Sequence, residues 1–101
     1  MIFVFHLLDK PHGAELRQRM RSEHKAYLGA VASRIAFAGP LLASDGTTMI
    51  GSLLAINFDS REAAAQWQAG EPFTRAGLYA SMTVHAFQNL WPQKAGFAAA
   101  V

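Results

Sequence analysis

The fold of this chain is decided by one stretch, Arg21-Ser22-Glu23-His24-Lys25-Ala26-Tyr27-Leu28. At about 100° per residue, an apolar stripe that runs through this stretch lies within about 80° of His24 around a helix axis. The stripe consists of Leu16, Met20, Tyr27, Leu28 and Val31. It predicts an amphipathic helix over residues 14–33 that packs on a sheet. Because His24 shares the stripe, it is a core residue, a residue at the stripe's edge, or part of a site.

The sequence shows strand patterns both before and after this predicted helix. Residues 2–8 are nearly all apolar, and a run of this length is typical of a strand buried on both faces. Residues 34–43 and 49–58 predict two further strands. The dipeptide Asp45-Gly46 between them predicts a tight hairpin turn, because it readily supplies positive φ angles.

The second half of the chain continues the alternation of helix and strand. Asp59 or Ser60 can cap a helix that Gly70 ends. A short helical turn is expected over residues 71–77. Residues 78–88 predict a last strand, in which one face carries Tyr79, Ser81, Thr83, His85 and Phe87.

Together these elements predict an α+β domain of ferredoxin-like β-α-β-β-α-β order over residues 1–91, followed by a C-terminal tail over residues 92–101. A four-stranded antiparallel sheet would carry its helices on one face. Its other face is apolar and needs a cover, for which a second copy of the same sheet is the simplest choice. We therefore expect a homodimer, a dimeric α/β barrel, with a pocket in its interior.

Composition narrows the class of protein. The 101 residues are 51% hydrophobic and 16% charged, which fits one folded domain with apolar surface left for self-association. The net charge is +2 and no basic run occurs, so neither a nucleic acid nor a membrane is an expected partner. The N-terminal apolar run is too short for a signal peptide, and the chain contains no cysteine. These features are compatible with a cytoplasmic protein.

Short motifs follow one another in a characteristic order along nearly the whole chain. They are Asp9-Lys10-Pro11, Leu16-Arg17, Arg21-x-x-His24-x-x-Tyr27-Leu28, Gly39-Pro40-Leu41, Asp45-Gly46, Ile50-Gly51-Ser52, Glu71-Pro72-Phe73 and Ala76-Gly77-Leu78. Each motif taken singly is weak, but their order and spacing from about residue 1 to residue 91 are specific. In this order they resemble the YciI-related (YCII) family.

The resemblance implies the dimeric α+β barrel superfamily and a catalytic His–Asp pair, which corresponds here to His24 and Asp45. Asp9, at the end of the first strand, is a competing carboxylate that spacing does not exclude. The family's usual Asp-Pro before the short helical turn is Glu71-Pro72 in this chain. We assign Glu71 a capping role only.

The chemistry of a site around His24 follows from its neighbours on the helix. Imidazole exchanges a proton near neutral pH, and a carboxylate on its other nitrogen would fix the tautomer. Arg17 and Arg21 lie about 20° and 60° from His24 around the axis. They are either residues at the stripe's edge or anchors for a carboxylate or phenolate. Tyr27 is expected in the core with its hydroxyl near the substrate.

Neither a metal nor a cofactor is expected. The four histidines, at positions 6, 12, 24 and 85, show no ligand spacing such as His-x-x-x-His. The sequence also has no glycine-rich phosphate loop and no nucleophile elbow.

The leading hypothesis is a cofactor-independent enzyme, a lyase, an isomerase or a hydrolase, in which His24 transfers a proton and Asp45 orients it. Its substrate would be small and partly apolar, with aromatic or lactone-like character. The alternative is a non-catalytic domain that binds a small ligand or a partner, in which His24 is structural.

Overall fold

The computed structural model describes residues 1–91, so the predicted tail of residues 92–101 lies outside the described residues. The elements are β1 (Ile2–Asp9), α1 (Ala14–Gly29), the 3-10 helix η1 (Ala32–Arg34), β2 (Ile35–Leu42), β3 (Met49–Asn57), α2 (Arg61–Gly70), α3 (Pro72–Arg75) and β4 (Tyr79–Phe87). None of the helices within residues 1–91 is long and apolar enough to cross a membrane.

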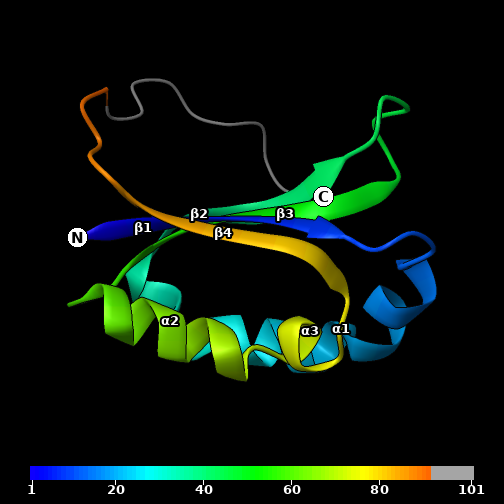
Figure 1. Ribbon diagram of the computed structural model, residues 1–101, viewed down its shortest axis with the longest axis horizontal. Helices are drawn as coiled ribbons and strands as arrows, with labels where there is room; N and C mark the ends of the chain where they lie inside the picture. Colours follow the sequence, from blue (N-terminus) through cyan, green and yellow to red (C-terminus); the bar gives the residue numbers. More distant parts are fainter. Residues whose placement is uncertain (92–101) are drawn as a thin grey trace.

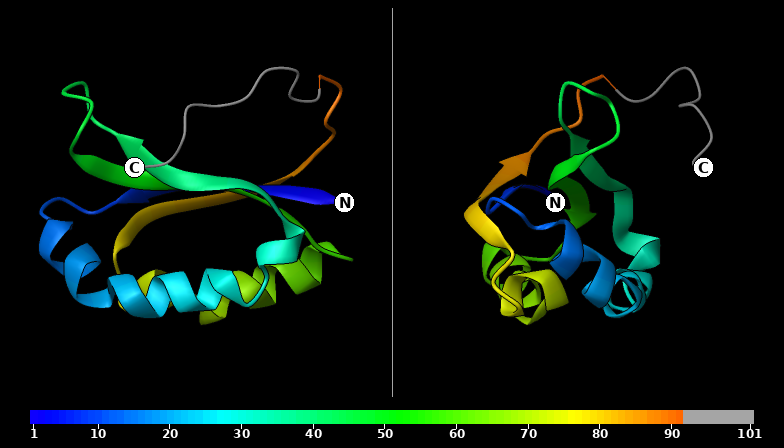
Figure 2. Two further views of the ribbon diagram at one scale, coloured as in Figure 1. Left: turned by 180° about the vertical axis from the view of Figure 1, so that it is seen from behind. Right: turned by 90° about the vertical axis from the view of Figure 1, so that its right-hand side faces the viewer.

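The sheet is antiparallel throughout, with strand order β2-β3-β1-β4. The helices α1, α2 and α3 lie together on one side of it (Figures 1 and 2). The predicted α+β, ferredoxin-like fold is thereby confirmed. In the described part of the chain no helix covers the opposite face, which we call the open face. The dimer predicted to cover it stays a prediction.

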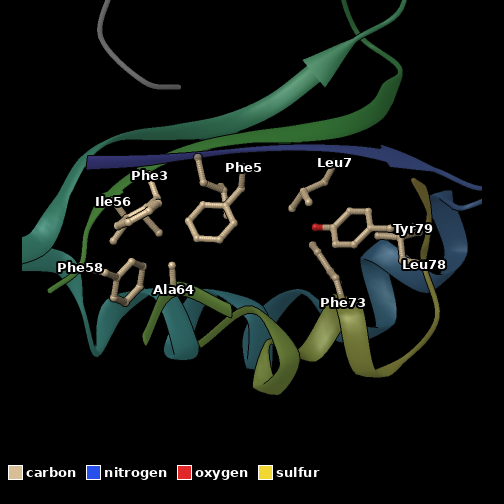
Figure 3. Close-up of a cluster of buried hydrophobic side chains, with 10 residues drawn as sticks. Phe3, Phe5, Leu7, Ile56, Phe58, Ala64, Phe73, Leu78 and Tyr79 are labelled. Carbon is tan, nitrogen blue, oxygen red and sulfur yellow. The ribbon is translucent and has the colours of Figure 1, made fainter. Parts of the chain in front are cut away.

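The core lies between the sheet and the three helices. The central strand β1 turns Phe3, Phe5 and Leu7 toward the helices, where each is at most 3% exposed (Figure 3). The Phe5 ring contacts those of Phe58 and Trp67 at centroid distances of 6.2 and 5.6 Å. Burying one such side chain contributes about 1.5–3 kcal/mol. These alternate residues of β1 therefore fix its register in the sheet.

The open face corrects one prediction about β1. His6 and Leu8, which point away from the helices, are exposed, so only one face of β1 is buried in the single chain. The continuous apolar run had predicted burial on both faces. Its outward half instead belongs to an apolar patch, in which Leu53 of β3 lies opposite His6.

The helix α1 is shorter than its predicted range. The N–H of Val31 donates to the carbonyl of Leu28, and this i→i−3 bond tightens the backbone just after Gly29. Val31 consequently lies beyond α1, although it was predicted in the apolar stripe. The stripe residues Leu16, Met20 and Leu28 do pack against the core.

The two shorter helices begin at side-chain caps. Ser60 Oγ accepts the N–H of Ala63 at 3.0 Å, so Ser60 rather than Asp59 caps α2. The Glu71 carboxylate caps α3, and Pro72 occupies the first turn, where a missing N–H costs nothing. The sequence had left Asp59 and Ser60 as alternative caps for α2, and it had predicted the capping role of Glu71.

A bulge changes the direction of the Tyr79 side chain. On β1, Leu8 pairs with Ser81, and the next residue, Asp9, pairs with Tyr79, two positions before Ser81. The register therefore shifts between Leu8 and Asp9, as it does at a β-bulge. Strict alternation had predicted Tyr79 on the same face as Ser81. In the structure Tyr79 is 7% exposed and points into the core (Figure 3). The prediction for Tyr79 was therefore wrong, because alternation does not account for a bulge.

Candidate active site

A cavity of about 860 Å³ lies beside α1, on the helix-bearing side of the sheet. Its wall is made by α1, α3, β2, β3 and the β2–β3 turn. From α1 it receives Arg17, Arg21, His24, Lys25 and Leu28. Arg21, Leu28 and Arg17 lie three, four and seven residues from His24, so they share its side of the helix. The cavity thus lies within one chain, between helix and sheet, and not between the two sheets of a dimer as predicted.

His24 forms a hydrogen bond with Glu71 inside this region. Nδ1 of His24 lies 2.5 Å from Oε1 of Glu71, and the two side chains are 16% and 2% exposed. Glu71 also accepts the N–H groups of Phe73 and Thr74 at 3.1 and 3.0 Å and the Thr74 hydroxyl at 3.3 Å. A carboxylate surrounded by donors is ionised and only accepts, so the Nδ1 atom of His24 carries the proton.

The environment of Glu71 supports this assignment. Burial opposes ionisation, but the hydrogen bonds from His24, Phe73 and Thr74 outweigh it and hold the pKa of Glu71 below its ordinary value of 4.5. The ring of Phe73 stacks on that of His24 at a centroid distance of 4.0 Å and an interplanar angle of 13°. Together these contacts orient the His24 ring, and its Nε2 atom forms no hydrogen bond within residues 1–91.

Asp9 is the partner of Arg17 and does not contact His24. Nε and Nη2 of Arg17 donate to Oδ2 and Oδ1 of Asp9 at 2.6 and 2.9 Å, with side chains 9% and 5% exposed. This buried bidentate pair joins the end of β1 to the first turns of α1. Arg17, predicted at the stripe's edge or as an anion anchor, has its charge compensated by Asp9.

Asp45 lies in the predicted hairpin turn, where Gly46 has φ of +74°. Its carboxylate accepts the N–H groups of Thr47 and Thr48 at 2.9 Å each and the Thr48 hydroxyl at 2.5 Å. The hydrogen bonds of Thr48, helped by that of Thr47, lower the pKa of Asp45 to about 2. The structure thus pairs His24 with Glu71 and not with Asp45, because the oxygens of Asp45 are used within its own turn.

The remaining predicted residues separate into two groups. Arg21 lines the cavity beside His24 and is exposed. Tyr27 points elsewhere: its hydroxyl donates to the carbonyl of Trp67 at 2.8 Å, and the two rings are 5.3 Å apart. Tyr27 therefore connects α1 to α2, and no contact places it in the cavity wall.

Two residues of the site were not assigned to it from the sequence. Glu71 was given only a capping role, and Ser52 of β3, which lines the cavity, was named only within the motif Ile50-Gly51-Ser52. The signal for Glu71 was the Glu-Pro that stands at the family's Asp-Pro position, just before α3. Among residues 1–91, no group of three or more His, Asp or Glu side chains could hold a metal ion.

The chain is thus a ferredoxin-like α+β domain in which a histidine–carboxylate pair lies beside a cavity. Within this class of domains, the chain belongs to the YCII-related family, since the YCII-related domain matches residues 1–88. It is 31% identical over 98 residues to protein YciI of Escherichia coli O6:H1. The matched region covers 90% of this chain and 100% of that protein. An uncharacterized protein of Haemophilus influenzae matches with the same identity and coverage.

A solved structure is similar to the whole fold. It is the 5-chloro-2-hydroxyhydroquinone dehydrochlorinase TftG of Burkholderia phenoliruptrix AC1100, in complex with 2,5-dihydroxybenzoquinone. The TM-score is 0.80 at 28% identity, and the match covers 87% of this chain and 94% of that chain.

Proposed function

We propose that this protein is a small-molecule enzyme in which His24 transfers protons through its Nε2 atom. The observation that carries the proposal is the 2.5 Å contact between His24 Nδ1 and Glu71 Oε1. Because the ionised Glu71 keeps Nδ1 protonated, the lone pair of neutral His24 is on Nε2. His24 lines the cavity, so a ligand bound there can meet this lone pair.

In the proposed reaction, Nε2 takes a proton from an O–H or C–H bond of the substrate. The electron pair of that bond forms a new π bond, and a leaving group departs with its own electron pair or a proton returns at another atom. Glu71 stays ionised and stabilises the imidazolium, and the stacked Phe73 ring holds the imidazole in place. These steps describe elimination in the first case and isomerisation in the second.

The similarity to TftG supports this type of reaction. TftG is a dehydrochlorinase, an enzyme that removes hydrogen chloride, and its complex contains a dihydroxylated quinone. The cavity of the present chain combines apolar residues such as Leu28, Leu54 and Phe73 with the polar face of α1. We therefore propose a hydroxylated aromatic or quinone-like substrate, and place hydrolysis of a lactone-like compound second.

Asp45 has an indirect place in this proposal. Thr47 and Thr48, whose N–H groups bind the Asp45 carboxylate, line the same cavity as His24. Asp45 would thus order the rim of the cavity, while Glu71 takes the role next to the imidazole that the sequence had suggested for Asp45.

Turnover of chlorinated and hydroxylated hydroquinones, followed by chloride release and by absorbance, tests the proposal. His24→Ala should lower kcat by about 10²–10⁴-fold, since that is the usual contribution of a positioned acid–base group. His12→Ala is the matched control, because His12 is exposed in the loop between β1 and α1. Turnover that survives in His24→Ala would remove His24 from the mechanism.

The alternative function is ligand binding without catalysis. It is favoured by one observation, namely that Glu71 also caps α3, which gives the His24–Glu71 bond a structural use. Binding of these compounds without turnover by the wild-type protein would decide for this alternative.

We also propose that the protein is a homodimer that buries the open face. This face carries large apolar side chains from three of its four strands, with Leu8 of β1, Phe37 of β2 and Phe87 of β4 exposed by 36%, 42% and 44%. Large apolar side chains exposed on an uncovered sheet face are typical of an interface, and a two-fold axis would place the same face on both sides of it.

A further inference from the structure

Ser52 occupies a polar position in the wall of the cavity. It lies on β3, is 3% exposed, and lines the same cavity as His24. Its Oγ accepts a hydrogen bond from Nη2 of Arg17 at 3.1 Å and lies 3.3 Å from the hydroxyl of Tyr79. Gly51, just before Ser52, allows β3 to approach closely, since a Cβ at Gly51 would lie 2.3 Å from the carbonyl oxygen of Leu7.

The directions of the two hydrogen bonds of Ser52, with Arg17 and with Tyr79, decide where the Ser52 proton can point. Arg17 only donates, so Ser52 Oγ must accept from it. Burial raises the pKa of Tyr79 to about 12, so its hydroxyl keeps its proton. Within residues 1–91, Ser52 Oγ is the only hydrogen-bond partner of that hydroxyl. Either hydroxyl of the Ser52–Tyr79 contact can donate, but only Ser52 lines the cavity, so the arrangement in which Tyr79 donates lets the Ser52 proton meet an acceptor of a bound ligand and leaves neither proton unsatisfied.

This arrangement leaves the proton of Ser52 without an acceptor. A hydroxyl has two acceptor positions and one proton, and both acceptor positions of Ser52 are filled by Arg17 and Tyr79. With Tyr79 as the donor, residues 1–91 offer no acceptor for the Ser52 proton. The remaining direction is the cavity that Ser52 lines.

Arg17 adds further donors at the same place. Its Nε and Nη2 atoms bind Asp9 and Ser52, whereas Nη1 has no partner among residues 1–91. The Arg17 side chain is 9% exposed and lines the cavity, and its guanidinium lies 5.1 Å from the centroid of the Phe73 ring. Asp9 holds this guanidinium in position, so its free N–H groups are arranged before any ligand binds.

The charge of the cavity wall indicates what these donors would bind. No acidic residue lines the cavity, while Arg21 and Lys25 line it and form no ion pair within the described residues. An anionic ligand is therefore favoured over a neutral one.

We propose that the Ser52 hydroxyl and Nη1 of Arg17 form a donor pair that binds an oxyanion of the substrate, a phenolate or an enolate oxygen. This proposal rests on the proposed function, because the oxyanion belongs to the substrate from which His24 would remove a proton in the same cavity. It assigns Ser52 a positioning and specificity role. Donors prearranged toward an oxygen would stabilise the negative charge that develops when His24 removes a proton.

The test uses binding of 4-nitrophenol, whose absorbance reports its own ionisation, and of its uncharged methyl ether 4-nitroanisole. The wild-type protein should bind 4-nitrophenolate more tightly than 4-nitroanisole and should lower the pH at which the bound nitrophenol ionises. Ser52→Ala should weaken phenolate binding by roughly tenfold to hundredfold, leave the anisole unaffected and reverse most of the ionisation shift. Ser81→Ala, on the open face, is the matched control and should change neither.

Two further variants separate the donor role from a structural one. Ser52→Cys keeps a similar volume but replaces a strong donor by a weak one, so it should also lose the phenolate preference even if Ser52→Ala does not fold. Tyr79→Phe leaves the Ser52 proton in place and should weaken phenolate binding less than Ser52→Ala does.

Several outcomes would overturn the proposal. They are a wild-type protein without preference for the phenolate, and Ser52 variants that weaken both ligands equally or neither. These binding results do not depend on turnover. Loss of the proposed enzymatic function would appear instead as activity that is absent from the wild type or survives in His24→Ala.

Discussion

Nδ1 of His24 and Oε1 of Glu71 lie 2.5 Å apart although the two residues are separated by 47 positions in the chain. The contact forms because α1 and α3 pack on the same side of the sheet, so that the cap of the short helix faces the middle of the long one (Figure 1). One carboxylate thereby performs two tasks, since it caps α3 and orients the imidazole. This relationship leads to predictions that do not require a known substrate.

We expect neutral His24 to carry its proton on Nδ1. Glu71→Gln should weaken that preference, because an amide side chain can present either a donor or an acceptor to the ring. Asp45→Asn should leave it unchanged, since the Asp45 carboxylate binds only its own turn. Nitrogen-15 NMR of the imidazole in the three proteins measures the tautomer. A His24 spectrum that changes with Asp45→Asn and not with Glu71→Gln would restore the pair suggested by the sequence.

Stability should depend on pH through Glu71. Its pKa is lowered in the folded protein, so its contribution is present above the ordinary value of 4.5 and is lost as the pH falls through the lower folded value. At neutral pH, Glu71→Gln should therefore reduce the free energy of unfolding by about 2 kcal/mol. Urea unfolding at a series of pH values should show this difference shrinking below pH 4.5. A difference that stays constant or grows in acid would contradict the assignment of an ionised Glu71.

The Asp9–Arg17 pair should be important for stability and not only for the site. Asp9→Ala leaves the guanidinium buried without its carboxylate and should cost about 3–5 kcal/mol of unfolding free energy. The double variant Asp9→Leu, Arg17→Met removes both charges and should recover a large part of that loss. Chemical denaturation of the two variants provides the comparison. If the double variant is less stable than Asp9→Ala, the loss comes from packing and not from an unpaired charge.

The proposed dimer can be tested at the centre of the open face. Leu53→Glu places a carboxylate opposite His6 in an apolar patch and should convert a dimer into a monomer. Sedimentation at micromolar concentration distinguishes the two. Gln66→Glu, at an exposed position of α2, adds the same charge away from that face and should leave the dimer intact. A wild-type protein that sediments as a monomer would exclude this interface.

The elements of the fold could be read from local patterns. The helix period around His24, the turn residues Asp45-Gly46 and the caps at Ser60 and Glu71 are interactions between residues that are near in sequence. Such patterns predicted the element order, and one-sided packing of the helices followed from it. The errors arose where strands meet, as at Tyr79, because a bulge depends on the partner strand and not on the local sequence.

The sequence by itself determined the β-α-β-β-α-β order, the family and the choice of His24 as the candidate site residue. Only the tertiary structure decided which carboxylate orients that histidine, and which residues lie opposite it in the cavity. Asp9, Asp45 and Glu71 each carry a carboxylate, and spacing along the chain does not distinguish them. Packing does, because it leaves Asp9 beside Arg17, Asp45 within its own turn and Glu71 against the imidazole. The residues from 21 to 28 thus predict a helix with a histidine on its buried side, and the helix packing supplies the partner that makes this histidine a candidate catalyst.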